Sequence, residues 1–277
     1  MNQGIVWAFM GTGFTFLMTA FGASVVFILK NDMGKNLQRA FLGFAAGVMI
    51  AASVWSLLIP SIDQAADMGN FAFVPAAGGF ALGGIFLMLL DMLMPHLHLG
   101  ESKAEGVPSS FRRTTLLILA VTLHNIPEGM AVGLAFALAA QHPEDASLYA
   151  AAFALAVGIG IQNFPEGAAI SLPLRQEGMS RGKSFLYGSL SGFVELIFGV
   201  GITMIAEVIT PYMPWFLGFA AGAMIYVVVE ELIPEANQGE HSNLGTVGVM
   251  VGFLIMMVLD VCLLYTSPSP RDVEESR

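Results

Sequence analysis

The chain has 277 residues, of which 56% are apolar and 12% are charged, about half the charged share of an ordinary soluble domain. Such a composition excludes a disordered chain, and 11 basic against 21 acidic residues exclude a basic surface for nucleic acid. The single cysteine, Cys262, permits no internal disulfide and no thiolate metal cluster. Long apolar stretches without charge therefore predict an all-α membrane protein.

Eight apolar runs reach the length that crosses a bilayer, which takes about 20 helical residues. We expect membrane spans over residues 4–29, 40–62, 71–90, 114–140, 146–174, 184–210, 212–233 and 244–265. The first run is expected to remain as a span because Met1-Asn2-Gln3 lacks the basic lead of a cleavable signal peptide. Residues 1–265 then form one polytopic membrane domain, and the polar, proline-containing segment 266–277 is expected to be disordered or extraneous to the fold.

Basic residues indicate how the chain is oriented. Apart from two in the segment 266–277, all of them lie in the loops that follow spans one, three and five, namely Lys30, Lys35, Arg39, Lys103, Arg112, Arg113, Arg175, Arg181 and Lys183. The positive-inside rule places these loops in the cytoplasm and both termini outside it. We therefore expect a multi-pass protein of the plasma (cytoplasmic) membrane.

An internal repeat relates the two ends of the chain. The segment from Leu42 to Ile50 recurs from Leu217 to Ile225 with one change, and each copy runs on to a Leu-Ile-Pro. A weaker match pairs Gly83, Met88, Leu90 and Asp91 with Gly252, Met257, Leu259 and Asp260. Span two thus matches span seven, and span three matches span eight. Because successive spans alternate in direction and five is an odd number, matching spans cross the membrane in opposite directions.

The central spans form a second related pair, since His124-Asn125-Ile126-Pro127-Glu128-Gly129 corresponds to Gln162-Asn163-Phe164-Pro165-Glu166-Gly167. The whole chain is thus a 3+2+3 inverted repeat, with halves at about 4–94 and 184–265 and a central hairpin at 114–174. Inverted repeats are typical of secondary transporters. Helix packing alone can also produce repeated small residues.

Polar side chains gather near the middle of the expected spans. Helical spacing puts His124 and Glu128 on one face, about 6 Å apart along the axis, and the same holds for Gln162 and Glu166. Each carboxylate at this depth costs about 2.5–3.5 kcal/mol, and no span contains a lysine or arginine. A divalent cation or protons would neutralise them. The candidate metal ligands are His124, Asn125, Glu128, Gln162, Asn163, Glu166, Glu195 and Met49.

The two central prolines predict a kink beside these ligands. Pro127 and Pro165 lack a backbone N–H, so the carbonyl groups of Leu123 and Ile161 are expected to lose their usual partners. Such groups are tolerated at membrane depth where they line a cavity or meet protein. The alternative interpretation is that the amides serve as polar contacts between helices and that Met49 only fills the core.

Together these motifs resemble the ZIP (Zrt/Irt-like) metal transporters, and in particular the bacterial GufA-like branch, from span one to span eight. The resemblance implies an eight-helix secondary transporter that imports divalent metal ions, zinc foremost and also cadmium, iron or manganese. It further implies an elevator-like slide of spans one, four, five and six against spans two, three, seven and eight. The metal would be cargo, so neither a catalytic cofactor nor enzyme activity is expected.

Two metal positions follow from the resemblance. It implies a primary metal bound by His124, Glu128, Gln162, Glu166 and Met49. It implies a second metal bound by Asn125, Asn163 and Glu195, with Glu128 and Glu166 bridging. Gln162 stands where many members have histidine and Asn163 where some have aspartate, so the second position carries less charge here. The histidine-rich loop of the family is reduced to His96 and His98.

Acidic residues nearer the span ends suggest a path for the ion. The orientation puts Asp63 and Asp260 toward the outside, and Asp91, Glu230 and Glu231 toward the cytoplasm. An entrance at the first pair and an exit at the second group would follow, although acidic residues at span ends also sit in interfacial water.

The competing function is an intramembrane zinc-dependent hydrolase, with a metal-bound water near His124. The sequence lacks the His-Glu-x-x-His pair of such enzymes. The expected partners are divalent metal ions and the lipid bilayer, and the small-residue motifs are also compatible with a homodimer.

Overall fold

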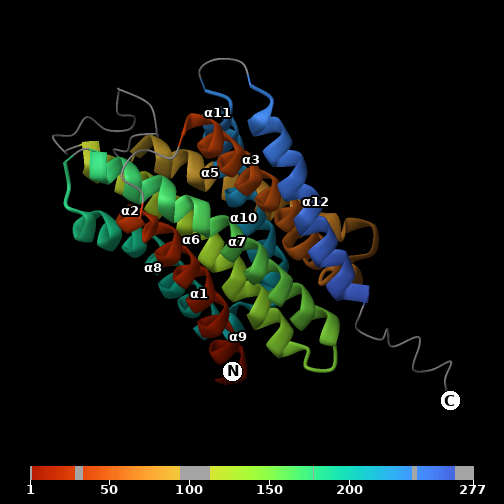
Figure 1. Ribbon diagram of the computed structural model, residues 1–277. Coiled ribbons are helices and arrows are strands. Elements are labelled where there is room, and N and C mark those ends of the chain that lie inside the picture. The colour runs from red at the N-terminus through yellow and green to blue at the C-terminus, as the bar shows by residue number, and fades with distance from the viewer. Residues whose placement is uncertain (1, 29–33, 94–112, 177, 239–241, 266–277) are drawn as a thin grey trace.

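The computed structural model describes residues 2–28, 34–93, 113–176, 178–238 and 242–265, and every regular element within these ranges is a helix. Figure 1 shows the long helices side by side. They are α1 (Asn2–Ala23), α3 (Lys35–Ala52), α5 (Phe73–Leu93), α6 (Arg113–Gln141), α7 (Ala146–Gln176), α8 (Arg181–Met204), α10 (Met213–Val227) and α12 (Leu244–Tyr265). The start of α1, the end of α12 and the turn between α6 and α7 all lie toward the lower end of Figure 1.

Seven helical segments within the described residues are long and apolar enough to cross a membrane, which supports a multi-pass membrane protein. They are Gln3–Ile28, Lys35–Asp63, Phe73–Leu93, Ala146–Arg175, Arg181–Met204, Thr210–Ala236 and Leu244–Cys262. The eighth long helix, α6, has 29 residues but is not among the seven. Part of α6 lies outside the residues whose side chains the structure describes.

Several expected spans are composite. The first ends at Ala23 and resumes as α2 (Val25–Ile28), while α8 stops at Met204 and is followed by α9 (Ala206–Ile209) and the 3-10 turn η3 (Thr210–Tyr212). The expected span 184–210 is therefore interrupted near its end, because Ile205 adopts φ −98° and ψ 4° and leaves the helical path. By contrast, α7 continues through Pro173 and ends at Gln176.

The two copies of the repeat share a π-helical segment. In the first copy α3 passes into η1 (Ser53–Leu58) and then α4 (Ile59–Asp63); in the second, α10 passes into η4 (Val228–Leu232) and then α11 (Ile233–Ala236). A 3-10 segment, η2 (Ala66–Phe71), leads from α4 to α5. Each π segment directly precedes the helix that carries the proline of Leu-Ile-Pro at its second position. π-Helical turns are rare and often mark functional positions in longer helices.

The long helices pack in two groups. The first bundle contains α1, α6, α7 and α8; the second bundle contains α3, α5, α10 and α12. The two bundles meet where α7 contacts α3 and α12, and where α6 contacts α10.

Glycines of the repeat set the spacing inside the second bundle. A Cβ atom on Gly43 of α3 would lie 2.1 Å from the carbonyl oxygen of Gly245 on α12, and one on Gly222 of α10 would lie 2.0 Å from that of Phe80 on α5. Both distances are shorter than any real contact, so the helix backbones touch at these points. Small residues allow this close approach of helices in membranes.

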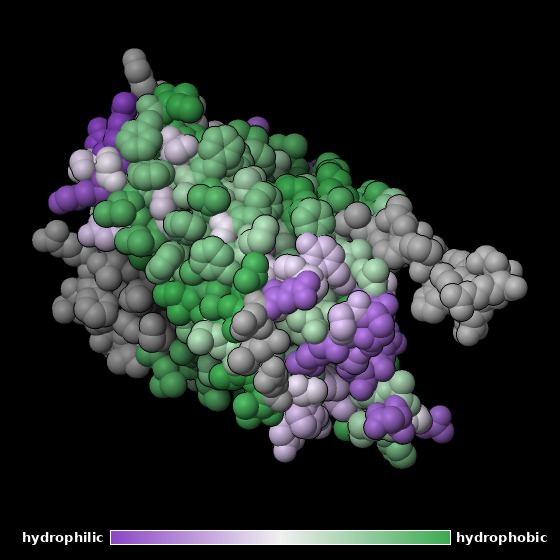
Figure 2. Space-filling model, turned by 90° about the horizontal axis from the view of Figure 1, so that it is seen from below, coloured by the Kyte–Doolittle hydropathy of each residue, from purple (hydrophilic) through white to green (hydrophobic). Residues whose placement is uncertain are grey.

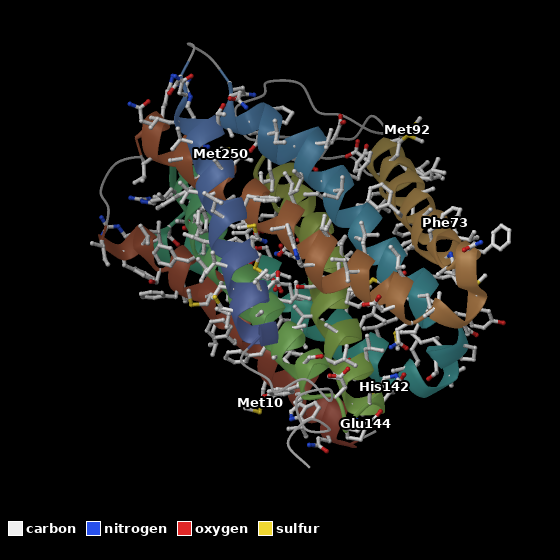
Figure 3. All side chains as sticks on the ribbon, turned by 90° about the vertical axis from the view of Figure 1, so that its right-hand side faces the viewer. Met10, Phe73, Met92, His142, Glu144 and Met250 are labelled. Carbon is white, nitrogen blue, oxygen red and sulfur yellow. The ribbon has the colours of Figure 1, made fainter. Side chains whose placement is uncertain are left out.

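The outer surface is mainly apolar, as a membrane protein requires. In Figure 2 hydrophobic residues cover most of the visible face, and hydrophilic residues gather toward two opposite ends of it. Met10, Phe73, Met92 and Met250 point away from the helices in Figure 3 and are 66%, 56%, 62% and 58% exposed. Continuous apolar surface of this kind suits contact with lipid.

Candidate metal site

The two Pro-Glu-Gly motifs lie within unbroken helices. Pro127 is inside α6 and Pro165 is inside α7, and both helices continue on either side. Asn125, Glu128 and Gln162 are buried, with relative exposures of 0%, 1% and 0%. His124 belongs to α6, but its side chain lies outside the described part of the chain.

Gln162 and Glu128 join α7 to α6 through their side chains. The amide Nε2 of Gln162 donates a hydrogen bond of 2.7 Å to Oε1 of Glu128. An amide nitrogen donates and an amide oxygen accepts, so this bond fixes which end of the Gln162 side chain faces the carboxylate. The oxygen Oε1 of Gln162 is left without a hydrogen-bond partner.

Asn163 makes the corresponding connection from α7 to α8. Its Nδ2 donates to Oε1 of Glu195 at 2.8 Å and to the backbone carbonyl oxygen of Thr15 on α1 at 3.2 Å. Asn163 and Glu195 are both fully buried. Two adjacent residues of α7 thus pair with carboxylates on two different helices.

The atoms left over in this polar cluster are mostly oxygens. Among the described residues, the buried side-chain atoms without a hydrogen-bond partner include Glu128 Oε2, Gln162 Oε1, Asn163 Oδ1, Glu166 Oε1, Glu195 Oε2 and both polar atoms of Asn125. An unpartnered buried polar atom costs about 1–3 kcal/mol, so a set of free acceptors in one place indicates a site for a cation.

Charge strengthens this interpretation. Glu128 interacts electrostatically with Glu166 and Glu195, and like charges in a low dielectric repel strongly. Carboxylate and amide oxygens suit zinc, manganese or iron, and imidazole or thioether groups suit the softer of these ions. Among the side chains that the structure describes, no three His, Cys, Asp or Glu groups could hold a metal by themselves. The amide oxygens would therefore have to take part.

Comparisons with known proteins identify the family. The family model described as "ZIP Zinc transporter" matches residues 99–260. "Zinc transporter ZIP11" of Homo sapiens is 38% identical over 95% of this chain and 98% of its own length. "Zinc transporter GufA" of Myxococcus xanthus is 34% identical over 88% and 94%, and "Zinc transporter ZIPB" of Bordetella bronchiseptica is 37% identical over 93% and 81%.

The chain belongs to the ZIP family. The resemblance expected from the motifs, including that to the bacterial GufA-like branch, is confirmed. ZIP proteins are transporters, so the interpretation as a transporter rather than an enzyme is also confirmed.

Glycines that follow the motif glutamates have a packing role in this ZIP protein that the sequence did not reveal. A Cβ on Gly129 would lie 2.4 Å from the backbone oxygen of Glu195, and one on Gly167 would lie 2.0 Å from that of Thr19. Gly129 therefore lets α8 approach α6 beside Glu128, and Gly167 lets α1 approach α7 beside Glu166. The only sign of this role in the sequence is that a glycine occupies the same position in both motifs.

Met49 is the remaining predicted ligand. It lies on α3, is 1% exposed, and belongs to the apolar core that includes Ala131 of α6 and Ile159 of α7. This placement puts Met49 in the second bundle, within a core that it shares with helices of the first bundle.

The acidic residues of the expected path occupy different environments. Asp63 and Glu230 are exposed, whereas Glu231 is 7% exposed and interacts electrostatically with Glu166. Asp91 accepts a hydrogen bond of 3.4 Å from the hydroxyl group of Tyr226. His96 and His98 lie outside the described residues.

Asp260 differs from a residue in interfacial water. It is fully buried on α12 and accepts a hydrogen bond of 2.9 Å from the Ser56 hydroxyl group in η1. Its Oδ2 has no partner. The structure thus adds Ser56 to the candidate residues, which sequence reasoning missed because one serine in an apolar run is unremarkable.

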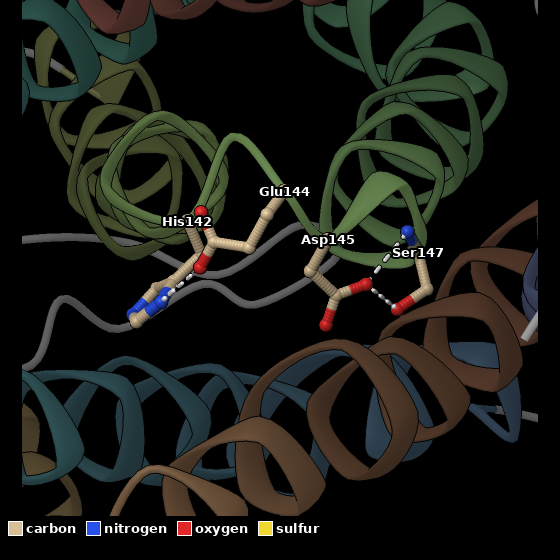
Figure 4. A network of polar contacts seen from close by, with 4 residues as sticks. All are labelled: His142, Glu144, Asp145 and Ser147. Carbon is tan, nitrogen blue, oxygen red and sulfur yellow. Dashed lines mark hydrogen bonds and ion pairs between the residues drawn. The ribbon is translucent and has the colours of Figure 1, made fainter. Parts of the chain in front are cut away.

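The turn between α6 and α7 carries further polar groups on the surface. Figure 4 shows His142 facing Glu144, with 3.4 Å between Nδ1 and Oε1. Asp145 accepts hydrogen bonds from the backbone nitrogen and hydroxyl group of Ser147 at 2.9 and 2.5 Å. This side chain caps the start of α7, as an aspartate commonly does. The turn has a structural role that its own contacts explain.

Proposed function

We propose that this chain is a secondary transporter that imports divalent metal ions, zinc foremost, into the cytoplasm. The observation that carries the proposal is the set of unpartnered buried oxygens on α6, α7 and α8. The relatives named as zinc transporters support zinc as the cargo. Cadmium, iron and manganese accept the same donor types and are further candidate cargo.

The primary metal position is formed by His124, Glu128, Gln162, Glu166 and Met49. Glu128 Oε2, Gln162 Oε1 and Glu166 Oε1 are the free oxygens on this side. Dehydrating zinc costs energy, and these oxygens with the His124 imidazole would replace its water ligands. A bound cation would also offset the repulsion between the carboxylates.

The second position involves Asn125, Asn163 and Glu195. Its free oxygens include Asn163 Oδ1 and Glu195 Oε2. Because Asn163 is neutral, this position holds less negative charge than one built with aspartate, and we propose that it binds the ion more weakly than the primary position.

The chain forms one membrane domain of eight spans, in which α6 is added to the seven apolar segments described above. At about 1.5 Å per residue, the 29 residues of α6 cover about 43 Å, longer than the hydrocarbon layer. The three cation-bearing loops face the cytoplasm of a plasma membrane, and both termini lie outside it, by the positive-inside rule.

The pattern of contacts supports the inverted repeat. If α3 corresponds to α10 and α5 to α12, the α3–α12 contact corresponds to the α10–α5 contact. Likewise, α1–α7 corresponds to α8–α6, and α7–α3 corresponds to α6–α10. These three contacts therefore have counterparts in the other repeat, as a two-fold relation between repeats requires, whereas the α7–α12 contact has no counterpart of similar extent between α6 and α5 within the described residues.

We propose that the first bundle slides against the second bundle to carry the ion. The candidate carboxylates and amides all lie on helices of the first bundle, whereas Met49 lies on the second. Asp63 and Asp260 with Ser56 would line the entrance, and Asp91, Glu230 and Glu231 the exit. An ion bound to one bundle can then be exposed to each side in turn.

Uptake into liposomes tests the proposal. Purified protein is reconstituted, and zinc entry is followed with a trapped fluorescent indicator, with Glu128→Ala and Glu166→Ala as variants. Both are expected to lose uptake while the detergent-solubilised protein keeps its melting profile. Glu144→Ala is the control because that side chain is 72% exposed on the surface turn. Wild-type uptake by folded Glu128→Ala would contradict the proposal.

A further inference from the structure

Three threonines form one face of α1. Thr12, Thr15 and Thr19 are each fully buried, although the helix is otherwise almost entirely apolar. Their hydroxyl groups donate to backbone carbonyl oxygens of the preceding turn, from Thr12 to Ala8 at 2.7 Å, from Thr15 to Thr12 at 3.0 Å and from Thr19 to Thr15 at 3.3 Å. Such bonds satisfy a buried hydroxyl group within its own helix.

Packing accounts for two of these threonines. The Thr12 methyl group lies 2.4 Å from the position that a Cβ on Gly199 would take. Thr19 likewise lies within 2.9 Å of the Cβ position of Gly192. Both therefore fill the space that glycines of α8 leave open. Neither has a described contact with the acidic side chains of the metal site.

Thr15 lies between them and does contact the site. Its carbonyl oxygen accepts a hydrogen bond from Asn163 Nδ2, whose other bond goes to Glu195. Because Thr12 meets Gly199 and Thr19 meets Gly192 along α8, the side chain of Thr15 lies opposite Glu195. A hydroxyl group can rotate between acceptors, so Thr15 can donate either to Thr12 or to Glu195.

We propose that Thr15 is a positioning residue for the second metal position, an inference that rests on the proposed function. With both N–H bonds of Asn163 directed at Thr15 and Glu195, the oxygen Oδ1 is turned away from these acceptors and remains free. When the hydroxyl group of Thr15 rotates from Thr12 toward α8, it gives the Glu195 carboxylate a second donor. Asn163 Oδ1 and Glu195 Oε2 are thereby held ready for the ion.

This role assigns a function to α1, which contributes none of the predicted ligands. A rotated Asn163 amide would present N–H groups to a cation and repel it. A Glu195 carboxylate held by one donor alone would lose orientation. Removing the Thr15 hydroxyl group therefore weakens metal binding without removing a ligand.

Thr15→Val tests the inference because valine keeps the shape of threonine and removes the hydroxyl group. We expect the Kd for zinc, measured by calorimetry on purified protein, and the KM of uptake to rise about tenfold, the effect of one hydrogen bond to a charged group. The maximal rate is expected to stay unchanged. Thr15→Ser restores the hydroxyl group and is expected to recover wild-type affinity.

Thr12→Val is the matched control, since Thr12 is equally buried on the same helix face and bonds only its own backbone. It is expected to leave Kd and KM unchanged. In a Glu195→Gln background, Thr15→Val is expected to add less than a twofold change, because Thr15 acts through that carboxylate. An equal loss in both backgrounds would overturn the inference.

The outcomes separate the two proposals. If wild-type protein neither binds nor transports zinc, the proposed function fails. If wild-type protein binds zinc and folded Thr15→Val binds it equally well, the inference alone is overturned and Thr15 is a packing residue. If Thr15→Val does not fold, Thr15→Ala and Thr15→Ser decide between the two results by the same comparison of Kd.

Discussion

The side-chain amide of Gln162 donates its 2.7 Å hydrogen bond to only one oxygen of Glu128, and the second oxygen of that carboxylate stays free. The same division occurs between Asn163 and Glu195. In each pair the amide supplies a donor that stabilises buried charge, while one oxygen on each partner remains available. Amides thus support the carboxylates here and can also act as ligands.

Replacing Gln162 separates these two roles. Gln162→Leu removes both the donor and the oxygen, so Glu128 Oε1 loses its partner, at a cost of about 1–3 kcal/mol. We expect a lower melting temperature and at least about tenfold weaker zinc binding. Gln162→His supplies a ring N–H and a nitrogen ligand, and is expected to retain binding. Calorimetry with zinc and thermal unfolding of both variants measure this; equal binding by Gln162→Leu would contradict it.

Asp260→Asn tests the entrance. Asparagine keeps an oxygen for the Ser56 hydroxyl group but removes a buried negative charge. We expect the KM for zinc uptake to rise about tenfold, since a negative path attracts cations, with an unchanged maximal rate. The melting temperature is expected to stay the same or to rise, because burying an unpaired charge is unfavourable. An unaltered KM would remove Asp260 from the path.

Gly222→Ala tests the close packing of α10 on α5. The added methyl group would meet the Phe80 backbone oxygen at 2.0 Å, and neither backbone can move without separating the helices. We expect a loss of at least about 1–3 kcal/mol of stability, seen as a lower melting temperature in detergent. Gly201→Ala is the control, because nothing lies within 4 Å of its Cβ position. Equal melting temperatures would refute the packing argument.

Cross-linking tests the sliding of the two bundles. A Cβ on Gly158 of α7 lies 2.2 Å from the Met256 sulfur atom on α12, so cysteines at both positions, with Cys262→Ser, are expected to bond across the bundles. Oxidation is expected to stop zinc uptake and reduction to restore it. The control pair is Phe14→Cys with Gly160→Cys, which lies within the first bundle. Normal uptake by the oxidised Gly158–Met256 pair would exclude sliding at this contact.

Hydropathy predicted much of the fold because span length depends only on local composition. The helix α12 covers the expected range 244–265. The break at Ile205 was missed, since an apolar run contains no signal for a residue that leaves the helical path. The two π-helical segments were missed for the same reason, although the repeat located the positions where they occur.

The candidate site was predictable as a set of residues but not as a set of contacts. The expected span ends placed Glu128 and Gln162 near the middle of the membrane, and the structure brings them together. The sequence could not reveal that Gln162 pairs with Glu128 while Asn163 pairs with Glu195, because this pairing depends on how each helix is rotated about its axis. The role of these residues in metal binding stays a prediction.

Depth alone left the environment of Asp260 open. Its position near the end of a span was compatible with a residue of the ion path or with a carboxylate in interfacial water, and the structure buries it beside Ser56. Thr15 was overlooked because threonines in an apolar helix usually bond their own backbone. Its contact with Asn163 arises only when α1 and α7 are packed together.

The pairing of α3 with α12 has a consequence for how the protein is made. The second span to leave the ribosome finds its main neighbour in the last one, and the contacting residues Gly43 and Gly245 are 202 positions apart in the chain. Until then its glycine face has lipid or another protein as its only contact. Biogenesis in the bilayer must therefore hold several inserted helices unassembled until translation is nearly complete.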